Sequence, residues 1–114
     1  MVHIYGIKSC GSVQKAIKFL EKHSIDYTFH DFKVTPVSRE KIDFWLTQTS
    51  LEILLNTKGT TYRTLGLKAM DLDNDAKIDW MTQNNLLLKR PIIESTHPLI
   101  VGFDESHYEG TLLS

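Results

Sequence analysis

The start of the chain alternates apolar and polar positions in a way that predicts strand, helix and strand. Val2–Tyr5 is typical of a short strand, and from Ser12 to about His23 the apolar residues fall at the spacing of one helix face. Tyr27–Phe32 alternates aromatic and polar residues, which indicates a second strand. A helix of this length can return the chain to the end of the sheet at which the first strand began. The pattern therefore predicts a βαβ unit with a parallel pair of strands.

The middle of the chain alternates short apolar runs with polar turns, which favours helices over strands. Ser38 is a suitable N-cap because its hydroxyl can accept a hydrogen bond from a free backbone N–H group of the first turn. The predicted segments are a helix carrying Ile42–Leu46, a short apolar run over Leu51–Leu55, a turn over Asn56–Gly59, a short helix over Tyr62–Leu67, an acidic loop over Asp71–Asp75 and a helix over Lys77–Asn84.

The last part of the chain predicts a hairpin and a terminal helix. Leu86–Glu94 leads into a third strand, Leu99–Phe103 is a fourth, and Ser95–Pro98 is the turn between them. Asp104–Leu112 predicts a weak helix interrupted by Gly110. This order predicts an α/β fold with a mixed four-stranded sheet, βαβ then ββα. A helical subdomain is inserted between strands two and three, at about residues 36–88.

Composition narrows the class of protein. A length of 114 residues predicts a single domain over 1–114, and a net charge of −1 argues against direct nucleic-acid binding. The N-terminus has no signal-peptide pattern, and no apolar run approaches the length of a membrane span. We expect a cytoplasmic protein without membrane contact. The histidines are scattered, so we expect no metal site, and a single cysteine excludes an intrachain disulfide.

That cysteine, Cys10, is the first candidate for chemistry. It lies where the first predicted strand gives way to the first predicted helix, in the Gly6–Ser12 loop of small and polar residues. Free N–H groups at a helix start favour the thiolate, which is the nucleophilic form of cysteine. The alternative is a small buried residue with an inert thiol. The position in the loop favours a reactive thiol.

Four short sequence motifs, in the same order along the chain, resemble those of the arsenate reductase-like family, which also contains the redox-responsive regulators called Spx. Tyr5–Cys10, with the form Tyr-Gly-Ile-x-x-Cys, is similar to the YffB-type branch of that family. The resemblance covers nearly the whole chain and implies a thioredoxin-like fold. The other motifs are Leu54–Gly59 running into Tyr62–Leu65, Lys89–Ile93 and Val101–Phe103.

The resemblance also implies site residues. Arg63 and Arg90 match arginines that hold the oxyanion near the cysteine, and a guanidinium suits that task because it offers a planar fork of donors. Pro91 matches a cis-proline beside the cysteine, where neighbouring backbone groups can pair with an extended thiol substrate. The alternatives are a solvated helix face for Arg63, a strand-edge charge for Arg90 and an ordinary trans proline at the start of a strand.

Three residues of the cysteine loop complete the predicted site. Backbone N–H groups at Gly11 and Ser12 are expected to hold an anionic group of a substrate or thiol. Lys8 is expected to steer a thiol carboxylate or to lower the pKa of Cys10. The alternative for Lys8 is a solvated loop lysine.

Departures from the family pattern bear on the substrate. Gly6 stands where arsenate reductases have a histidine, and Gly11–Gln14 lacks their arginine. Phe103–Tyr108 is acidic where a third arginine belongs, so the resemblance does not extend to arsenate itself. Val13 stands where most Spx regulators have the second cysteine of a Cys-x-x-Cys switch.

These features favour a monothiol reductase that acts through the Cys10 thiolate. It would bind no cofactor and would use glutathione or a similar small thiol as co-substrate, or a glutaredoxin-like protein as reductant. One alternative is an Spx-like transcriptional regulator that binds an RNA polymerase subunit. Another is a non-catalytic interaction module.

Overall fold

The computed structural model describes residues 2–113, which form two compact units. The first unit contains the chain up to Thr35 and from Arg90 onward, and the second is Pro36–Lys89. The second unit corresponds to the helical insertion predicted at about residues 36–88. A single domain over 1–114 stays a prediction.

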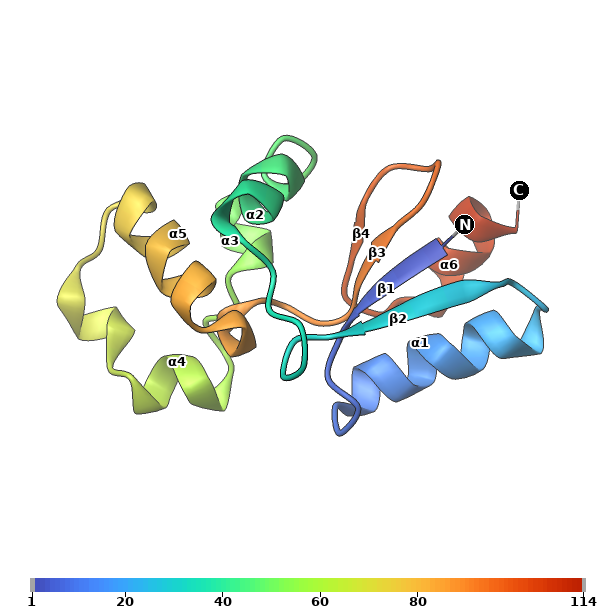
Figure 1. Ribbon diagram of the computed structural model, residues 1–114, viewed down its shortest axis with the longest axis horizontal. Helices are drawn as coiled ribbons and strands as arrows, with labels where there is room; N and C mark the ends of the chain where they lie inside the picture. Colours follow the sequence, from blue (N-terminus) through green and yellow to red (C-terminus); the bar gives the residue numbers. More distant parts are fainter. Residues whose placement is uncertain (1, 114) are drawn as a thin grey trace. The chain divides into compact units, whose positions relative to one another are not determined.

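A mixed four-stranded sheet organises the first unit (Figure 1). The strands are β1 (Val2–Gly6), β2 (Tyr27–Asp31), β3 (Ile92–Glu94) and β4 (Ile100–Val101), in the order β2-β1-β3-β4. β1 pairs parallel with β2 and antiparallel with β3, and β4 pairs antiparallel with β3. The predicted βαβ and ββα halves of a thioredoxin-like fold are confirmed.

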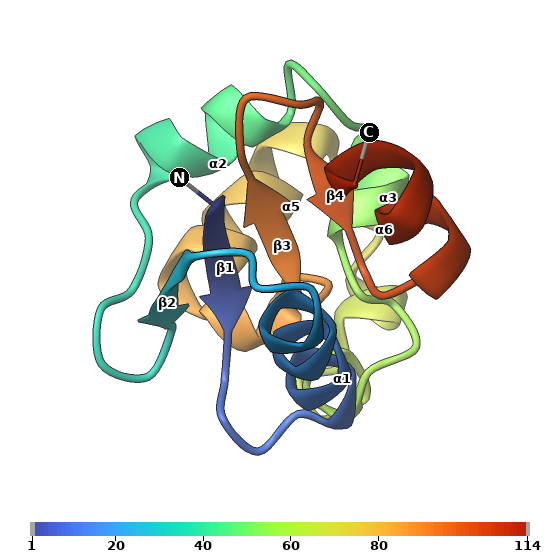
Figure 2. The same cartoon turned by 90° about the vertical axis from the view of Figure 1, so that its right-hand side faces the viewer.

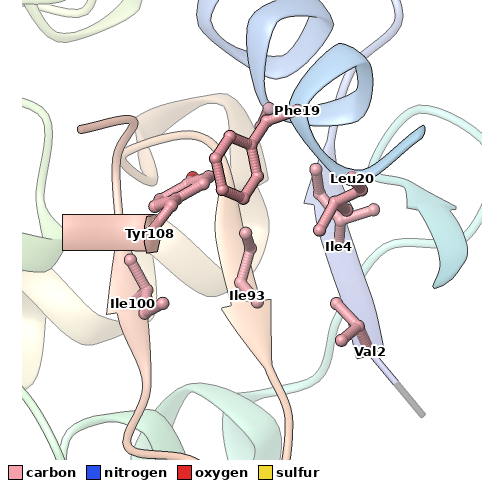
Figure 3. Close-up of a cluster of buried hydrophobic side chains, with 8 residues drawn as sticks. Val2, Ile4, Phe19, Leu20, Ile93, Ile100 and Tyr108 are labelled. Carbon is pink, nitrogen blue, oxygen red and sulfur yellow. The ribbon is translucent and has the colours of Figure 1, made fainter. Parts of the chain in front are cut away.

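One face of this sheet carries the core of the first unit (Figure 3). It packs against α1 (Gly11–Lys22) and α6 (Glu105–Leu112). Alternate strand residues point to this face because side chains in a strand have a period of two. Burying each large apolar side chain there contributes about 1.5–3 kcal/mol. The buried members are Val2, Ile4, Ala16, Phe19, Leu20, Ile93, Ile100 and Tyr108.

The other strand residues form a connected polar group. The Tyr5 hydroxyl donates a hydrogen bond to Glu94 at 2.8 Å, and the Tyr5 ring stacks on His30 with the ring centroids 4.4 Å apart. Nε2 of His30 lies 2.9 Å from Nδ1 of His3. Burial, and then the bond to the Glu94 carboxylate, raise the pKa of Tyr5. The phenol is therefore a neutral donor that ties β1 to β3.

The second unit is helical, as predicted. Arg39 of α2 forms ion pairs with two carboxylates of α5, Asp75 at 2.5 Å and Asp79, and thereby joins the two helices. Ser38 caps α2 by accepting the Lys41 N–H at 3.2 Å, which confirms the predicted cap. The elements are α2 (Arg39–Trp45), α3 (Leu51–Leu54), α4 (Thr60–Thr64), the 3-10 turn η1 (Leu67–Met70), α5 (Asn74–Gln83) and the 3-10 turn η2 (Asn85–Leu87).

Two predicted boundaries in this unit are wrong. The helix predicted over Tyr62–Leu67 lies earlier, as α4, because Gly66 has a left-handed backbone (φ 66°) that does not continue a right-handed helix. The predicted acidic loop over Asp71–Asp75 ends sooner than expected. Asp73 accepts the Ala76 N–H at 2.8 Å and starts α5 inside it.

Near the end of the chain one prediction is refined and one is wrong. The segment predicted to lead into the third strand begins with η2, because the Asn84 side chain accepts the Leu86 N–H at 3.1 Å, and β3 itself starts at Ile92. The terminal helix α6 runs through Gly110 without interruption. A Cβ added at Gly110 would meet no atom within 4 Å, so this glycine meets no packing constraint. In the described chain, no helix combines the length and the apolar character that spanning a bilayer requires.

Candidate functional site

A loop joins β1 to α1 (Figure 2). Cys10 is the last residue of this loop, as predicted. It is the N-cap residue of α1, with an extended backbone (φ −79°, ψ 124°) and a half-buried side chain. Its N–H donates to the Ile7 carbonyl at 3.3 Å, and its carbonyl accepts the Gln14 N–H at 3.0 Å. These two bonds fix the backbone of Cys10 at the helix start.

The surroundings of Cys10 favour its charged form. Burial raises the pKa of the thiol, but hydrogen bonds from the Val13 N–H, the Arg90 side chain and the Ser12 N–H outweigh it, and the pKa is lowered. The Cys10 side chain closes no capping hydrogen bond in the structure, so the N–H groups of Ser12 and Val13 act chiefly on its charged form. A thiolate accepts hydrogen bonds more strongly than a neutral thiol does. These donors therefore stabilise the charged form of Cys10 more than the neutral form.

Sheet register brings Arg90 to this thiol. Tyr5 pairs with Ile92 across β1 and β3, so the residues just before Ile92 run alongside the loop that follows β1. The Arg90–Pro91 peptide bond is cis, in agreement with the resemblance. The Pro91 carbonyl accepts the Gly102 N–H at 2.7 Å and is thus engaged within the first unit.

The remaining predicted site residues differ in how they relate to Cys10. Gly11 and Ser12 form the exposed first turn of α1, which has no acidic residue. Lys8 is exposed and its carbonyl accepts the Gln14 side-chain N–H at 2.9 Å, but its charge is not among the causes of the Cys10 shift. Arg63 is an exposed residue of α4 in the second unit, and its role stays a prediction.

Sequence reasoning missed one contributor to the site, Val13. Its side chain is fully buried, yet its backbone N–H is the first of the groups that lower the pKa of Cys10. The signal was present in the spacing, because the N–H groups two and three residues after an N-cap are those that face the cap side chain. The apolar side chain of valine gives no indication that its backbone N–H acts on the thiol.

The acidic stretch after β4 has a structural task. Asp104 accepts the His107 N–H at 3.1 Å and caps α6, and Glu105 lies in the first turn of that helix. Negative charge at a helix N-terminus is stabilising. Among residues 2–113, no group of three or more histidine, cysteine or acidic side chains is arranged to hold a metal ion.

Relatives share both the sequence and the fold. A global transcriptional regulator Spx from Lactiplantibacillus plantarum is 34% identical over 107 residues, which are 92% of this chain and 81% of that protein. An arsenate reductase-related protein from Brucella melitensis has a solved structure at 40% identity and a TM-score of 0.76, covering 96% of this chain and 92% of that one.

A second solved structure, that of a protein named YffB, superposes on this chain with a TM-score of 0.91. It is 34% identical and covers 98% of this chain and 99% of its own. The model of the ArsC family matches residues 5–111, which include the Cys10 loop, the inserted helices and the segment from Arg90 to β4. Because this match covers most of the chain, the chain belongs to the ArsC family.

Proposed function

We propose that this protein is a monothiol oxidoreductase that acts through the Cys10 thiolate and uses glutathione or a similar small thiol. One observation carries the proposal. Cys10 is half-buried at the start of α1, where two backbone N–H groups and the Arg90 side chain lower the pKa of its thiol. A lowered pKa increases the thiolate fraction near neutral pH and so increases nucleophilic reactivity.

The proposed reaction is two successive thiol–disulfide exchanges. The Cys10 thiolate attacks one sulfur of a disulfide substrate, a new S–S bond forms, and the other substrate sulfur leaves as a thiolate that takes a proton. A glutathione thiolate then attacks the substrate sulfur of this mixed disulfide. Cys10 leaves as the thiolate, and the substrate sulfur remains joined to glutathione. The cycle needs no second cysteine, in keeping with Val13 at the third position after Cys10.

The residues around the sulfur have matching tasks in this reaction. Arg90 and the N–H groups of Ser12 and Val13 stabilise the attacking and the leaving Cys10 thiolate. Lys8 and Gly11 are proposed to hold carboxylates of the thiol or an anionic substrate. A reducing bacterial cytoplasm would keep the single thiol reduced, and we propose that location.

The test couples activity to the thiol. Turnover of bis(2-hydroxyethyl) disulfide with glutathione is measured for the natural protein and for Cys10→Ser, with the pH dependence of iodoacetamide alkylation of Cys10 alongside. We expect turnover to fall to background in Cys10→Ser and the alkylation midpoint to lie below about 8.5, the ordinary cysteine value. Retained turnover in Cys10→Ser, or a midpoint at the ordinary value, contradicts the proposal.

A second candidate function is favoured by the relative named a global transcriptional regulator. In this function the chain would bind an RNA polymerase subunit and would not catalyse turnover. A pull-down against the C-terminal domain of the polymerase α-subunit separates the two functions. Binding that survives Cys10→Ser, without thiol-dependent turnover in the natural protein, favours the regulator.

A further inference from the structure

We propose that Gly6 and Val13 are positioning residues of the thiol site. The side chain of Val13 packs directly on the bare Cα of Gly6, and this contact sets how closely the first turn of α1 approaches the end of β1. The Val13 and Ser12 N–H groups belong to that turn, so the same contact places them at the Cys10 sulfur. The inference rests on the proposed function of Cys10, but its test measures the thiol itself.

The contact between the two residues is unusually close. A Cβ built on Gly6 would lie 2.5 Å from one γ-methyl carbon of Val13, 3.5 Å from the other and 3.6 Å from its Cβ. Carbon atoms that are not bonded prefer separations of about 3.5–4.0 Å. A side chain at position 6 therefore cannot coexist with valine at position 13 in this arrangement. Gly6 is required for the close approach of two chain segments.

Val13 cannot turn aside to relieve such a clash. Its side chain is fully buried, and a valine in a helix strongly prefers one χ1 rotamer. Rotation of the side chain would drive a methyl group into the neighbouring core, which is packed as densely as a crystal. A change at position 6 must therefore displace the helix backbone, and the N–H of Val13 moves with it.

Gly6, in contrast, is held by the sheet. It is the last residue of β1, it pairs with Asp31 of β2, and its carbonyl accepts the Phe32 N–H at 2.9 Å. Arg90 is fixed from the same sheet through the register of β3. The donors to the sulfur thus come from two bodies, the sheet and the first turn of α1. The contact of Val13 with Gly6 sets the distance between them.

The experiment uses three variants, Gly6→Ala, Val13→Ala and the double variant. The readout is the pH midpoint of Cys10 alkylation by iodoacetamide, with thermal melting alongside. Gly6→Ala is expected to raise the midpoint by about 0.5 pH units or more, a fall of about threefold in thiolate fraction below the midpoint. In the double variant the γ-carbons are gone and the added Cβ meets the Cβ of position 13 at 3.6 Å, so the midpoint should return to the natural value.

Gly110→Ala is the matched control. It makes the same substitution in α6, where an added Cβ meets nothing within 4 Å, and it should leave the midpoint unchanged. A purely structural role of the contact would lower the melting temperature of Gly6→Ala without moving its midpoint, and that result overturns the inference. If Gly6→Ala does not fold, the double variant decides. It must fold and titrate at the natural midpoint, and failure of either overturns the inference.

The outcomes separate this inference from the proposed function. A natural protein whose midpoint lies at the ordinary cysteine value contradicts the proposed function. A lowered natural midpoint that Gly6→Ala leaves in place contradicts only the positioning role of Gly6 and Val13. Absence of turnover with glutathione, together with the expected shifts, contradicts the reaction but not the positioning role.

Discussion

The two helices that cover the same face of the sheet begin in different ways. At the start of α6, the Asp104 carboxylate accepts the His107 N–H and Glu105 adds a negative charge to the first turn. At the start of α1, the N-cap is Cys10, no side chain closes a capping bond, and the first turn has no acidic residue. α6 uses its N-terminus for its own stability. α1 leaves its N–H groups to a sulfur whose charged form they stabilise.

In the second unit, most helices begin as α6 does. α2, α3 and α5 are capped by the side chains of Ser38, Ser50 and Asp73, and each has an acidic residue in its first turn. α4, a helix of five residues, begins at Gly59 without a side-chain cap. The start of α1 thus gives up stabilisation that the same chain uses elsewhere. That choice is understandable if the thiolate of Cys10 is the functional group.

Removing the Arg90 guanidinium should have the largest effect on the pKa of Cys10, and so on this contrast between the two helix starts. A hydrogen bond to a charged group contributes about 1.5–3 kcal/mol, and one pKa unit corresponds to about 1.4 kcal/mol. For a half-exposed sulfur we expect Arg90→Ala to raise the pKa of Cys10 by about one unit, and Arg90→Lys by less, because an ammonium keeps the charge but not the planar fork. The pH dependence of alkylation measures both.

Lys15→Ala provides the control for charge alone. Lys15 is an exposed cation of α1 that is not among the groups acting on the Cys10 thiol. Its removal should leave the alkylation midpoint within error of the natural value. Equal shifts in Arg90→Ala and Lys15→Ala would mean that general charge, and not the directed bond from Arg90, lowers the pKa.

Breaking the cap of α6 should affect stability and not the thiol. Asp104→Ala removes the acceptor of the His107 N–H, and the loss of such a cap costs about 1 kcal/mol in the free energy of unfolding. Asp104→Asn keeps a capping oxygen and should lose much less. Urea unfolding measures the difference, and alkylation of Cys10 should be the same in all three proteins. A changed thiol pKa in Asp104→Ala would contradict the separation of the two helix starts.

Most secondary-structure elements of the first unit could be predicted from the sequence because their signals are local. The period of two in β1 and β2 and the helical spacing in α1 each depend on neighbouring residues, and each prediction is confirmed. The capping hydroxyl of Ser38 is a local signal of the same kind in the second unit, and it is also confirmed. The errors lie at element boundaries that one residue decides and that its type alone does not fix. The left-handed backbone of Gly66 ends α4 early, Asp73 starts α5 early, and the Asn84 side chain turns the chain into η2.

The candidate site was predictable in its side chains and in the general role of the N–H groups at the start of α1, but not in the contacts that bring its parts together. Cys10 was identified from its loop, and Arg90 from a motif that resembles the family. The strand register that brings them together is a long-range property of β1 and β3. The part played by Val13 comes from its backbone N–H and from a contact with a residue that has no side chain. The valine side chain does not reveal the backbone role, and Gly6 does not show which residue packs against it. Arg63 stays a prediction because it belongs to the other unit.

The smallest effect should appear in the pH dependence of stability. The folded-state pKa of Cys10 is lowered relative to the unfolded chain, so the thiolate stabilises the fold. This contribution is fully present above the unfolded-state pKa of about 8.5 and is lost as the pH falls through the lowered folded-state value. Cys10→Ser replaces it with a capping hydroxyl that does not titrate and that contributes about 0.5 kcal/mol at the low end of capping effects.

The stability advantage of Cys10→Ser should therefore be largest in mild acid and should shrink as the pH approaches about 9, where the natural protein gains its thiolate. Urea unfolding at several pH values measures it, and all other titrating groups cancel because both proteins share them. Cys10→Ala has neither a cap nor a thiolate, so its difference from the natural protein isolates the ionisation. A difference that stays constant across this range would mean that the start of α1 holds the sulfur no better when it is charged.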